Sequence, residues 1–507
     1  MEFIEYLPQV FTGWNLLVLL LGTVGGLVLG ATPGLSPTMA VALLIPFTFH
    51  MEPITSLILL GAVYTATVAG GAVSAILVNI PGAPSNIATI LDGHPMAQQG
   101  RATEALHYCF ISSLVGGLLG VLVLIFFTPV LADFALSFGP AELFWIAVLG
   151  VTVIGSLGSK SVLKGLFAGA VGLWISTIGY DPVLGEQRFV FTDHLAGGIN
   201  IIAALIGLFA IPQVLTMLES ATVGKDVSMY DMERRSLWAS LRFNLGRVRA
   251  LTIGSIVGIF VGLIPGAGGQ IAGLVAYDQS KKFSRHPDRY GKGEADGVIS
   301  AESANNAMVG PSLVPLLTLG VPGSPTAAVL LGGLLIHGLF PGPNLFTVHA
   351  EVTWTFIGSL LVGQVLMAMF GLWISRFSRF VTRIPNNFMA ASVTVLAVFG
   401  TFSVQNSFSD VLVMMTLGTA MYFFMKFGFS PAPVVLGIIL GPIAETNYAQ
   451  GRLIAQSADG GALAYFFTGT ANLVLIALCL ASVGYSIVSE VRSIRRRRQE
   501  TASWQRA

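Results

Sequence analysis

Neutral, oxygen-bearing side chains gather around four proline–glycine pairs that interrupt apolar stretches of this sequence. The pairs are Pro33-Gly34, Pro81-Gly82, Pro265-Gly266 and Pro322-Gly323. Proline removes a backbone donor and clashes with the preceding helical turn, and glycine relaxes the backbone, so each pair should split a helix into two half-helices. The N-terminus of a downstream half-helix offers free N–H groups and the positive end of its dipole to an anion. The pattern therefore predicts carboxylate binding.

The same breaks could hold a small cation, because unwound carbonyls and side-chain oxygens suit Na⁺. The candidate binding residues at the first two breaks are Gly34, Ser36, Thr38, Asn79, Pro81, Gly82, Ser85, Asn86 and Thr89. Those at or near the other two are Gly266, Gly268, Gln270, Asn305, Asn306, Gly323, Ser324 and Thr326. A single such pair is more often a kink than a site, but pairs that match between two halves favour a site.

Two acidic residues in apolar surroundings are candidates for ion coupling, since charges inside a membrane are costly and commonly functional. For Asp92 the favoured interpretation is a helix end at the cytoplasmic surface, because Gly-His-Pro follows it directly. Glu302 and Asn305 lie one turn apart and should share a helical face. For them ion binding and structural hydrogen bonding both stay open.

The breaks occur in two matched sets. At one constant offset Gly26 aligns with Gly258, Gly30 with Gly262, Pro33 with Pro265 and Gly34 with Gly266. At a second offset Ile80-Pro81-Gly82-Ala83-Pro84-Ser85 aligns with Val321-Pro322-Gly323-Ser324-Pro325-Thr326. Corresponding Gly/Pro-interrupted segments in two halves of a membrane protein are the best sequence indication of a transporter's binding site.

The composition is that of a polytopic, all-α membrane protein. Hydrophobic residues make up 54% and charged residues 10% of the 507 residues, against roughly 25% charged in soluble domains. Apolar runs recur that are long enough to cross about 30 Å of hydrocarbon. The net charge of +1 says nothing about nucleic acid. We expect no nucleic-acid partner in a membrane protein of this kind, contacts with membrane lipids are expected, and a homo-oligomer stays open. Cys109 and Cys479 in apolar segments indicate no disulfide framework.

The motifs of membrane metalloproteases, of hydrolases and of ATP-driven pumps are missing from the sequence. The energy for transport would therefore come from an ion gradient, with Na⁺ or H⁺ as the coupling ion. No cofactor and no other metal are expected. A passive channel and a membrane-embedded enzyme acting on lipids are the alternatives. The enzyme would need clustered carboxylates or a nucleophile with a base.

Charge orients the segments, because cytoplasmic loops carry the excess of Lys and Arg. The tracing has a periplasmic N-terminus and a cytoplasmic C-terminus, and it leaves only Arg188 and Arg452 outside. It predicts about 11 to 12 transmembrane helices in two repeats. About five crossings separate the two hairpins, and an odd number turns the second repeat upside down, which would give inverted topology and alternating access.

The predicted first repeat covers 1–220, with a hairpin at about 15–47 and a broken helix at about 53–96. The second covers 251–490, with a hairpin at about 251–278 and a broken helix at about 298–337. A basic cytoplasmic loop, 221–250, separates them and a basic tail, 491–507, follows. Each hairpin could be re-entrant or an ordinary kinked crossing.

Several stretches together resemble the large membrane subunit of tripartite tricarboxylate transporters, over nearly the whole chain. They are Pro33 to Phe49, Ala75 to Gly82, Asp92 to Ala97, Glu302 to Ala307, Leu319 to Ser324 and Pro341 to Pro343. Two positions depart from the family pattern: His94 stands where an aromatic residue is usual, and Ala276 to Lys282 lacks the expected Ser-Tyr and Glu-Lys pairs. Both lie beside the breaks, so the details of the second site are open.

The resemblance implies a bacterial inner-membrane symporter for tri- or dicarboxylates such as citrate, coupled to Na⁺ or H⁺. It also implies a small membrane subunit and a periplasmic solute-binding protein that delivers substrate. An elevator-like motion of the hairpin-bearing domain is expected by analogy with other carboxylate transporters.

Overall fold

The computed structural model describes residues 2–157, 161–181, 185–192, 195–220, 236–266, 268–375, 386–456, 461–484 and 488. Part of the predicted basic loop (221–235) and the predicted basic tail lie outside these residues. The chain divides into two compact units. Unit 1 comprises Met1–Leu136 and Leu205–Gly418, and unit 2 comprises Ser137–Ala204 and Thr419–Ala507. Each unit thus takes residues from both halves of the sequence.

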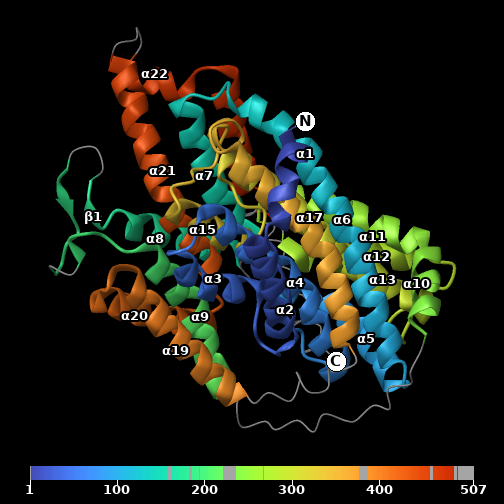
Figure 1. Cartoon of the computed structure of the whole chain (residues 1–507). Coiled ribbons are helices and arrows are strands. Elements are labelled where there is room, and N and C mark those ends of the chain that lie inside the picture. The colour runs from blue at the N-terminus through green and yellow to red at the C-terminus, as the bar shows by residue number, and fades with distance from the viewer. Residues whose placement is uncertain are drawn as a thin grey trace, which may run out of the picture. The chain divides into compact units, whose positions relative to one another are not determined.

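Helices dominate the structure, as predicted (Figure 1). The first part of unit 1 contains α1 (Glu2–Tyr6), η1 (Leu7–Phe11), α2 (Gly13–Ala31), α3 (Pro37–Thr48), α4 (Pro53–Val78), η2 (Pro84–Asn86), α5 (Ile87–Gln98) and α6 (Ala102–Ala135). Its second part contains most of α9 (Ile201–Ser220), then α10 (Leu237–Gly246), α11 (Val248–Leu263), α12 (Gly268–Lys282), η4 (Pro287–Arg289), α13 (Ala295–Ala307), α14 (Val309–Leu319), α15 (Pro325–Ile336), α16 (Asn344–Thr347), α17 (Ala350–Ile374), α19 (Asn386–Gln405) and most of α20 (Phe408–Lys426).

Eight of the described helices are long and apolar enough to cross a membrane, and a ninth span results if the bent pair α10–α11 counts as one. Five shorter apolar helices accompany them: Pro37–Thr48, Pro140–Val153, Val162–Ser176, Pro325–Ile336 and Thr470–Gly484. The all-α, polytopic fold is therefore confirmed.

All four proline–glycine pairs interrupt helices. Gly34 separates α2 from α3 and Gly266 separates α11 from α12, each with a positive φ that favours glycine. The helices before the other two pairs end in left-handed residues, Asn79 after α4 and Gly320 after α14. Each break thus starts with a residue type suited to leaving a helix.

The segment predicted as one broken helix at 298–337 contains a second break. Helix α13 ends at Ala307 and α14 starts at Val309. Pro311 has no N–H to donate to the Ala307 carbonyl, which explains why the helix is interrupted here.

The two halves repeat the same close backbone contacts. Gly30 of α2 packs on α4, where an added Cβ would lie 2.4 Å from the Thr67 carbonyl oxygen. Gly262 of α11 packs on the chain between α13 and α14, where a Cβ would lie 2.6 Å from the Met308 carbonyl oxygen. Glycine at these positions lets the helices approach closely.

The loops at the later breaks also match. The N–H of Gly82 donates to the Gly71 carbonyl at 3.2 Å, and the N–H of Gly323 donates to the Ser312 carbonyl at 3.0 Å. A Cβ at Gly82 or Gly323 would meet the carbonyl oxygen of Gly30 or Gly262, at 2.5 and 2.6 Å. Each loop therefore folds back onto both helices of its own half.

Unit 2 contains α7 (Pro140–Leu157), α8 (Val162–Ser176), β1 (Gly179–Tyr180), β2 (Gln187–Arg188), α21 (Pro431–Gln456) and α22 (Gly461–Phe467). Helices α7 and α8 pack against α21. The antiparallel pair β1–β2, which was not predicted, aligns Gly179 with Arg188. Arg188 forms ion pairs with Asp181 and with Glu445 of α21, so the strand pair is fastened to that helix.

Candidate functional site

A carboxylate lies in the interior of unit 1, on α13. The Glu302 side chain is fully buried and accepts hydrogen bonds from three neutral groups. Thr89 Oγ1 and Asn86 Nδ2 donate to Oε1, the latter at 3.3 Å, and Ser113 Oγ donates to Oε2 at 3.4 Å. Helices α5, α6 and α13 and the turn η2 supply these four side chains.

Within the described residues, Glu302 forms no ion pair with a basic side chain. A buried carboxylate is costly unless it is protonated or paired with a cation. The arrangement is therefore chemically suited to take up a proton or a small cation.

Unpaired amide groups surround this carboxylate. The Oδ1 atoms of Asn86 and Asn306 and both amide atoms of Asn305 are buried without a hydrogen-bond partner in the described structure. Asn306 also donates from Nδ2 to Ser113 Oγ at 2.7 Å. Buried polar groups are nearly always paired, so unpaired ones in a native site require an explanation such as a ligand.

Asn305 faces the first turn of α12. A Cβ added at Gly269 would lie 2.6 Å from Asn305 Oδ1 and 2.9 Å from Ser85 Cβ. Helix α12 starts at Gly268, so the N–H groups of this turn have no partners within the helix. An unpaired amide and a helix N-terminus thus meet beside Ser85, an arrangement suited to a carboxylate.

A second set of polar side chains lies at the tips of the other two breaks. Thr38 at the start of α3 and Thr326 at the start of α15 share a hydrogen bond of 2.9 Å. Ser324 Oγ accepts from the Ala327 N–H and so caps α15, and it lies 2.8 Å from Tyr64 Oη. Ser312 Oγ lies 3.2 Å from the same Tyr64 oxygen. Hydroxyl groups therefore form two hydrogen-bonded sets, one that joins α3 to α15 and one that joins α4 to α14 and to the N-cap of α15.

The side chains around Glu302 and Asn305 and the hydroxyl side chains at the other two breaks occupy equivalent places in the two repeats. The tip of the first hairpin meets the last break through Thr38 and Thr326, and the tip of the second hairpin meets the second break through Gly269 and Ser85. Each hairpin tip therefore contacts the interrupted helix of the other half.

The structure places the other predicted residues outside these hydrogen-bonded groups. Asn79 and Gln270 are exposed, and Ser36 caps α3 by accepting from the Met39 N–H. Backbone geometry explains the remaining ones: Gly34, Gly266 and Gly268 have positive φ, and Pro81, Gly82 and Gly323 form the loops of the breaks.

Asp92 is buried within α5, which continues to Gln98, so it does not end a helix as predicted. Its Oδ1 accepts three backbone N–H bonds of 2.8 Å, from Gly291, Gly293 and Glu294. Its Oδ2 accepts from Tyr277 Oη at 2.9 Å. Four donors hold this carboxylate, and it ties α5 to the loop before α13 and to α12.

Sequence reasoning did not select Tyr64, Ser113 or Ser312. Each lies in a mostly apolar helix, where a hydrogen bond from a hydroxyl to its own helix is the ordinary expectation. Polarity did not single out Tyr64 either, because Thr65 and Thr67 stand beside it in α4. No group of three or more His, Cys, Asp or Glu side chains that could hold a metal occurs among the described residues.

Comparison with known proteins agrees with the architecture. Residues 16–436 match the "Tripartite tricarboxylate transporter TctA family". The chain is 33% identical over 488 residues to a 52.8 kDa protein of the TAR-I ttuC' 3' region of Agrobacterium vitis, covering 95% of each chain. A protein of the TAR-II ttuC' 3' region of the same organism is 31% identical over 243 residues, which are 47% of this chain and 97% of the relative. The chain therefore belongs to the tripartite tricarboxylate transporter TctA family, as the large, multi-pass membrane subunit of such a system.

Proposed function

We propose that this chain is the translocating subunit of an ion-driven symporter that imports small carboxylates across the bacterial inner membrane. The substrates are tri- or dicarboxylates such as citrate. A periplasmic binding protein delivers them, and a small membrane subunit completes the complex. The family assignment supports this tripartite organisation.

The observation that carries the proposal is the unpaired Asn305 amide at the N-terminus of α12. A substrate carboxylate bound here would accept from the Asn305 amide and from the free N–H groups of the first turn. Charge-assisted hydrogen bonds of this kind are stronger than neutral ones. Ser85 would add a hydroxyl donor from the second break.

In this proposal the coupling ion binds among the side chains around Glu302, next to the substrate. Asn305 and Glu302 lie one turn apart on α13, so substrate and ion would bind within reach of the same helix. In a Na⁺-coupled cycle the ion would be bound by the side-chain oxygens of Glu302, Thr89 and Ser113 and by the side-chain amide oxygen of Asn306. In a proton-coupled cycle Glu302 alone would carry the proton.

The matched contacts of the two halves support a repeat, and in this proposal an odd number of crossings between the hairpins makes it an inverted repeat with alternating access. In this proposal residues 1–220 and 251–490 are the repeats, the N-terminus is periplasmic, and the loop 221–250 and the tail 491–507 are cytoplasmic. Each hairpin tip touches the interrupted helix of the other half. If the two repeats swapped conformations, the site would open to the opposite side of the membrane. An elevator-like movement is the form we favour.

The proposal is tested by uptake of a panel of labelled carboxylates into proteoliposomes that contain this chain and its small subunit. Each carboxylate is measured with and without an inward Na⁺ or H⁺ gradient, and with and without the cognate binding protein. Accumulation should require one gradient and the binding protein. Uptake that only equilibrates, without either, would indicate a channel, and no uptake of any carboxylate would overturn the proposal.

A further inference from the structure

Helix α10 turns two polar residues inward and exposes several large apolar ones. Ser240 and Asn244 are buried against α6, where Ser240 contacts His107 at 3.1 Å and Asn244 donates to the Tyr108 carbonyl at 3.0 Å. Trp238, which is 74% exposed, and Leu245 lie on the outer side together with the exposed Arg242, and Leu237 at the start of the helix is exposed as well. Exposed tryptophan and leucine beside an arginine fit a helix that lies at the surface of a membrane.

The chain turns by 71° between α10 and α11, at Arg247. If α11 crosses the membrane, α10 must therefore run close to the membrane plane. Tryptophan and leucine on its outer side then lie at the depth of the interface, where tryptophan is enriched.

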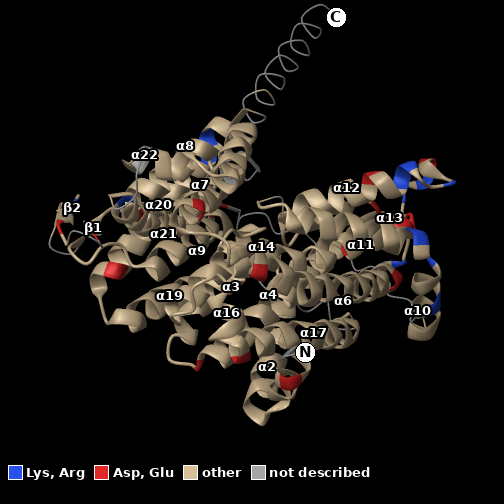
Figure 2. Cartoon of the chain, turned by 90° about the horizontal axis from the view of Figure 1, so that it is seen from above, with Lys and Arg blue, Asp and Glu red and all other residues tan. Residues whose placement is uncertain are grey.

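Basic residues lie at this corner, where the ribbon of Figure 2 is blue on and near α10. Arg242 on α10 is exposed, and Arg247 stacks over Phe243 with its guanidinium carbon 4.4 Å from the ring centre. Arg249 donates to the Phe283 carbonyl, which places it beside the end of α12. Asp296 pairs with both Arg247 and Arg249 at 3.5 and 3.3 Å, so one carboxylate serves two guanidinium groups. The corner keeps an excess of positive charge.

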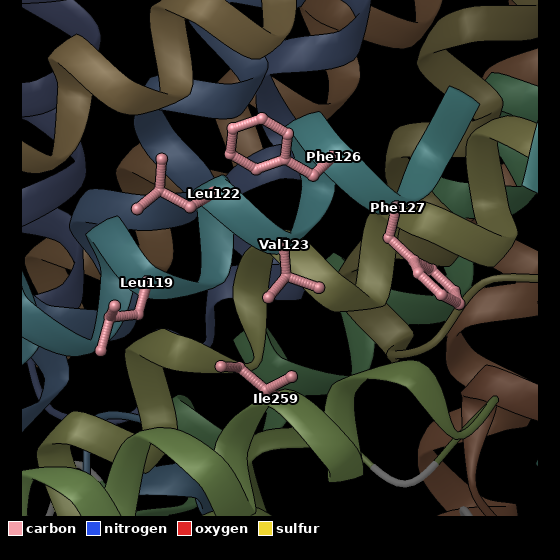
Figure 3. Close-up of a pocket in the computed structure, with 6 residues that line it drawn as sticks. All are labelled: Leu119, Leu122, Val123, Phe126, Phe127 and Ile259. Atoms are coloured by element: carbon pink, nitrogen blue, oxygen red, sulfur yellow. The ribbon is translucent and has the colours of Figure 1, made fainter. Parts of the chain in front are cut away.

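A shallow apolar groove lies deeper on the same helices (Figure 3). It is lined by Leu119, Leu122, Val123, Phe126 and Phe127 of α6 and by Ile259 of α11. Ile259 lies eleven residues after Val248 at the corner, which is about 16 Å at 1.5 Å per residue. This is about half of the roughly 30 Å hydrocarbon thickness. The groove therefore starts about as far from the corner as one acyl chain of a phospholipid extends.

We propose that the α10–α11 corner binds an anionic phospholipid. Its phosphate lies at Arg242, Arg247 and Arg249, and one acyl chain runs along α11 and ends in the near part of the groove, at Ile259. The positive corner favours an anionic headgroup, and the apolar groove favours a hydrocarbon chain. This site is separate from Glu302 and Asn305 and does not depend on the transport proposal.

The test is native mass spectrometry of the full chain with its small subunit, titrated in detergent with phosphatidylglycerol or with phosphatidylcholine of the same chains. One phosphatidylglycerol should be retained in preference to phosphatidylcholine. Arg242→Gln should weaken its retention by about fivefold, the effect of one basic residue near an anionic surface. Ile259→Trp, which fills the groove, should weaken it as well. Arg452→Gln, an exposed arginine in unit 2, is the matched control and should change nothing.

Melting temperatures of all variants show whether each one still folds. Equal retention of both lipids, or retention that neither Arg242→Gln nor Ile259→Trp changes, would overturn the proposal. A cysteine at position 259 that crosslinks to the small subunit would also overturn it, because a protein helix would then occupy the groove.

Discussion

At the scale of single residues, two buried acids have different surroundings. Asp92 accepts four hydrogen bonds, three of them from backbone N–H groups. Glu302 is surrounded by hydroxyl and amide groups, several of which have an atom without a partner in the described structure. The first arrangement is that of a structural anchor, and the second is that of a site that can change its occupant.

The anchor is tested by a pair of variants at Asp92. Asp92→Asn keeps an acceptor for the backbone N–H groups and should retain gradient-driven uptake. Asp92→Ala leaves partly buried donors unpaired and should lower stability by about 2 to 4 kcal/mol. Thermal unfolding in detergent measures the difference. Loss of ion coupling in Asp92→Asn at an unchanged melting temperature would instead assign coupling to this residue.

Asn305 should determine substrate affinity. Asn305→Ala removes a donor to a carboxylate and should weaken equilibrium binding of the transported carboxylate by about tenfold or more, since hydrogen bonds to charged groups contribute about 1.5 to 3 kcal/mol. Gly269→Ala should act similarly, because its Cβ would occupy the space of the Asn305 oxygen. Asn472→Ala is the control, since Asn472 is also buried with an amide oxygen that has no described partner, but it belongs to unit 2. Equal loss in the control would argue against a specific role of Asn305.

At the scale of elements, glycines set the distance between α2 and α4 and between α11 and the α13–α14 segment. Gly30→Ala and Gly262→Ala should each cost about 1 to 3 kcal/mol of stability, because the new methyl group collides with a carbonyl oxygen. Gly25→Ala on α2 is the control, because a Cβ there meets no atom within 4 Å. Thermal unfolding of the three variants tests this. A control as unstable as Gly30→Ala would show that helix flexibility, and not packing, is the cause.

At the scale of the whole molecule, the inverted repeat predicts that equivalent ends of the two hairpins lie on opposite sides of the membrane. His50 after α3 and Lys282 at the end of α12 are such ends, and both are exposed. A membrane-impermeant maleimide should label His50→Cys from the periplasm and should label Lys282→Cys only after permeabilisation. The natural Cys109 and Cys479 are buried and should give little background. Labelling of both positions from one side would contradict inverted topology.

Much of this architecture could be predicted from the sequence, because proline and glycine act on the backbone locally. The four breaks at Pro33, Pro81, Pro265 and Pro322 are interruptions in the structure, as predicted. The break at Met308 was missed, because its cause, Pro311, is not followed by glycine. Local rules also misjudged Asp92, since Gly-His-Pro does not stop α5.

The grouping of side chains could not be predicted, because it depends on contacts between distant segments. Thr89 and Glu302 are separated by 213 residues, and Tyr64 and Ser324 by 260. A lone hydroxyl in an apolar helix gives no periodic signal that would identify its partner. The division into two units, each with residues from both halves, also requires the three-dimensional contacts.

The measurement that tests the central claim most directly compares two assays of Glu302→Gln in proteoliposomes. The first is gradient-driven accumulation of the carboxylate, and the second is its exchange with the same carboxylate inside. If Glu302 takes up the coupling ion, the variant should lose accumulation by at least about tenfold, the effect of roughly 1.4 kcal/mol, and should still exchange substrate. Glu104→Gln, another buried carboxylate, should keep both activities. Full accumulation by Glu302→Gln would contradict the account.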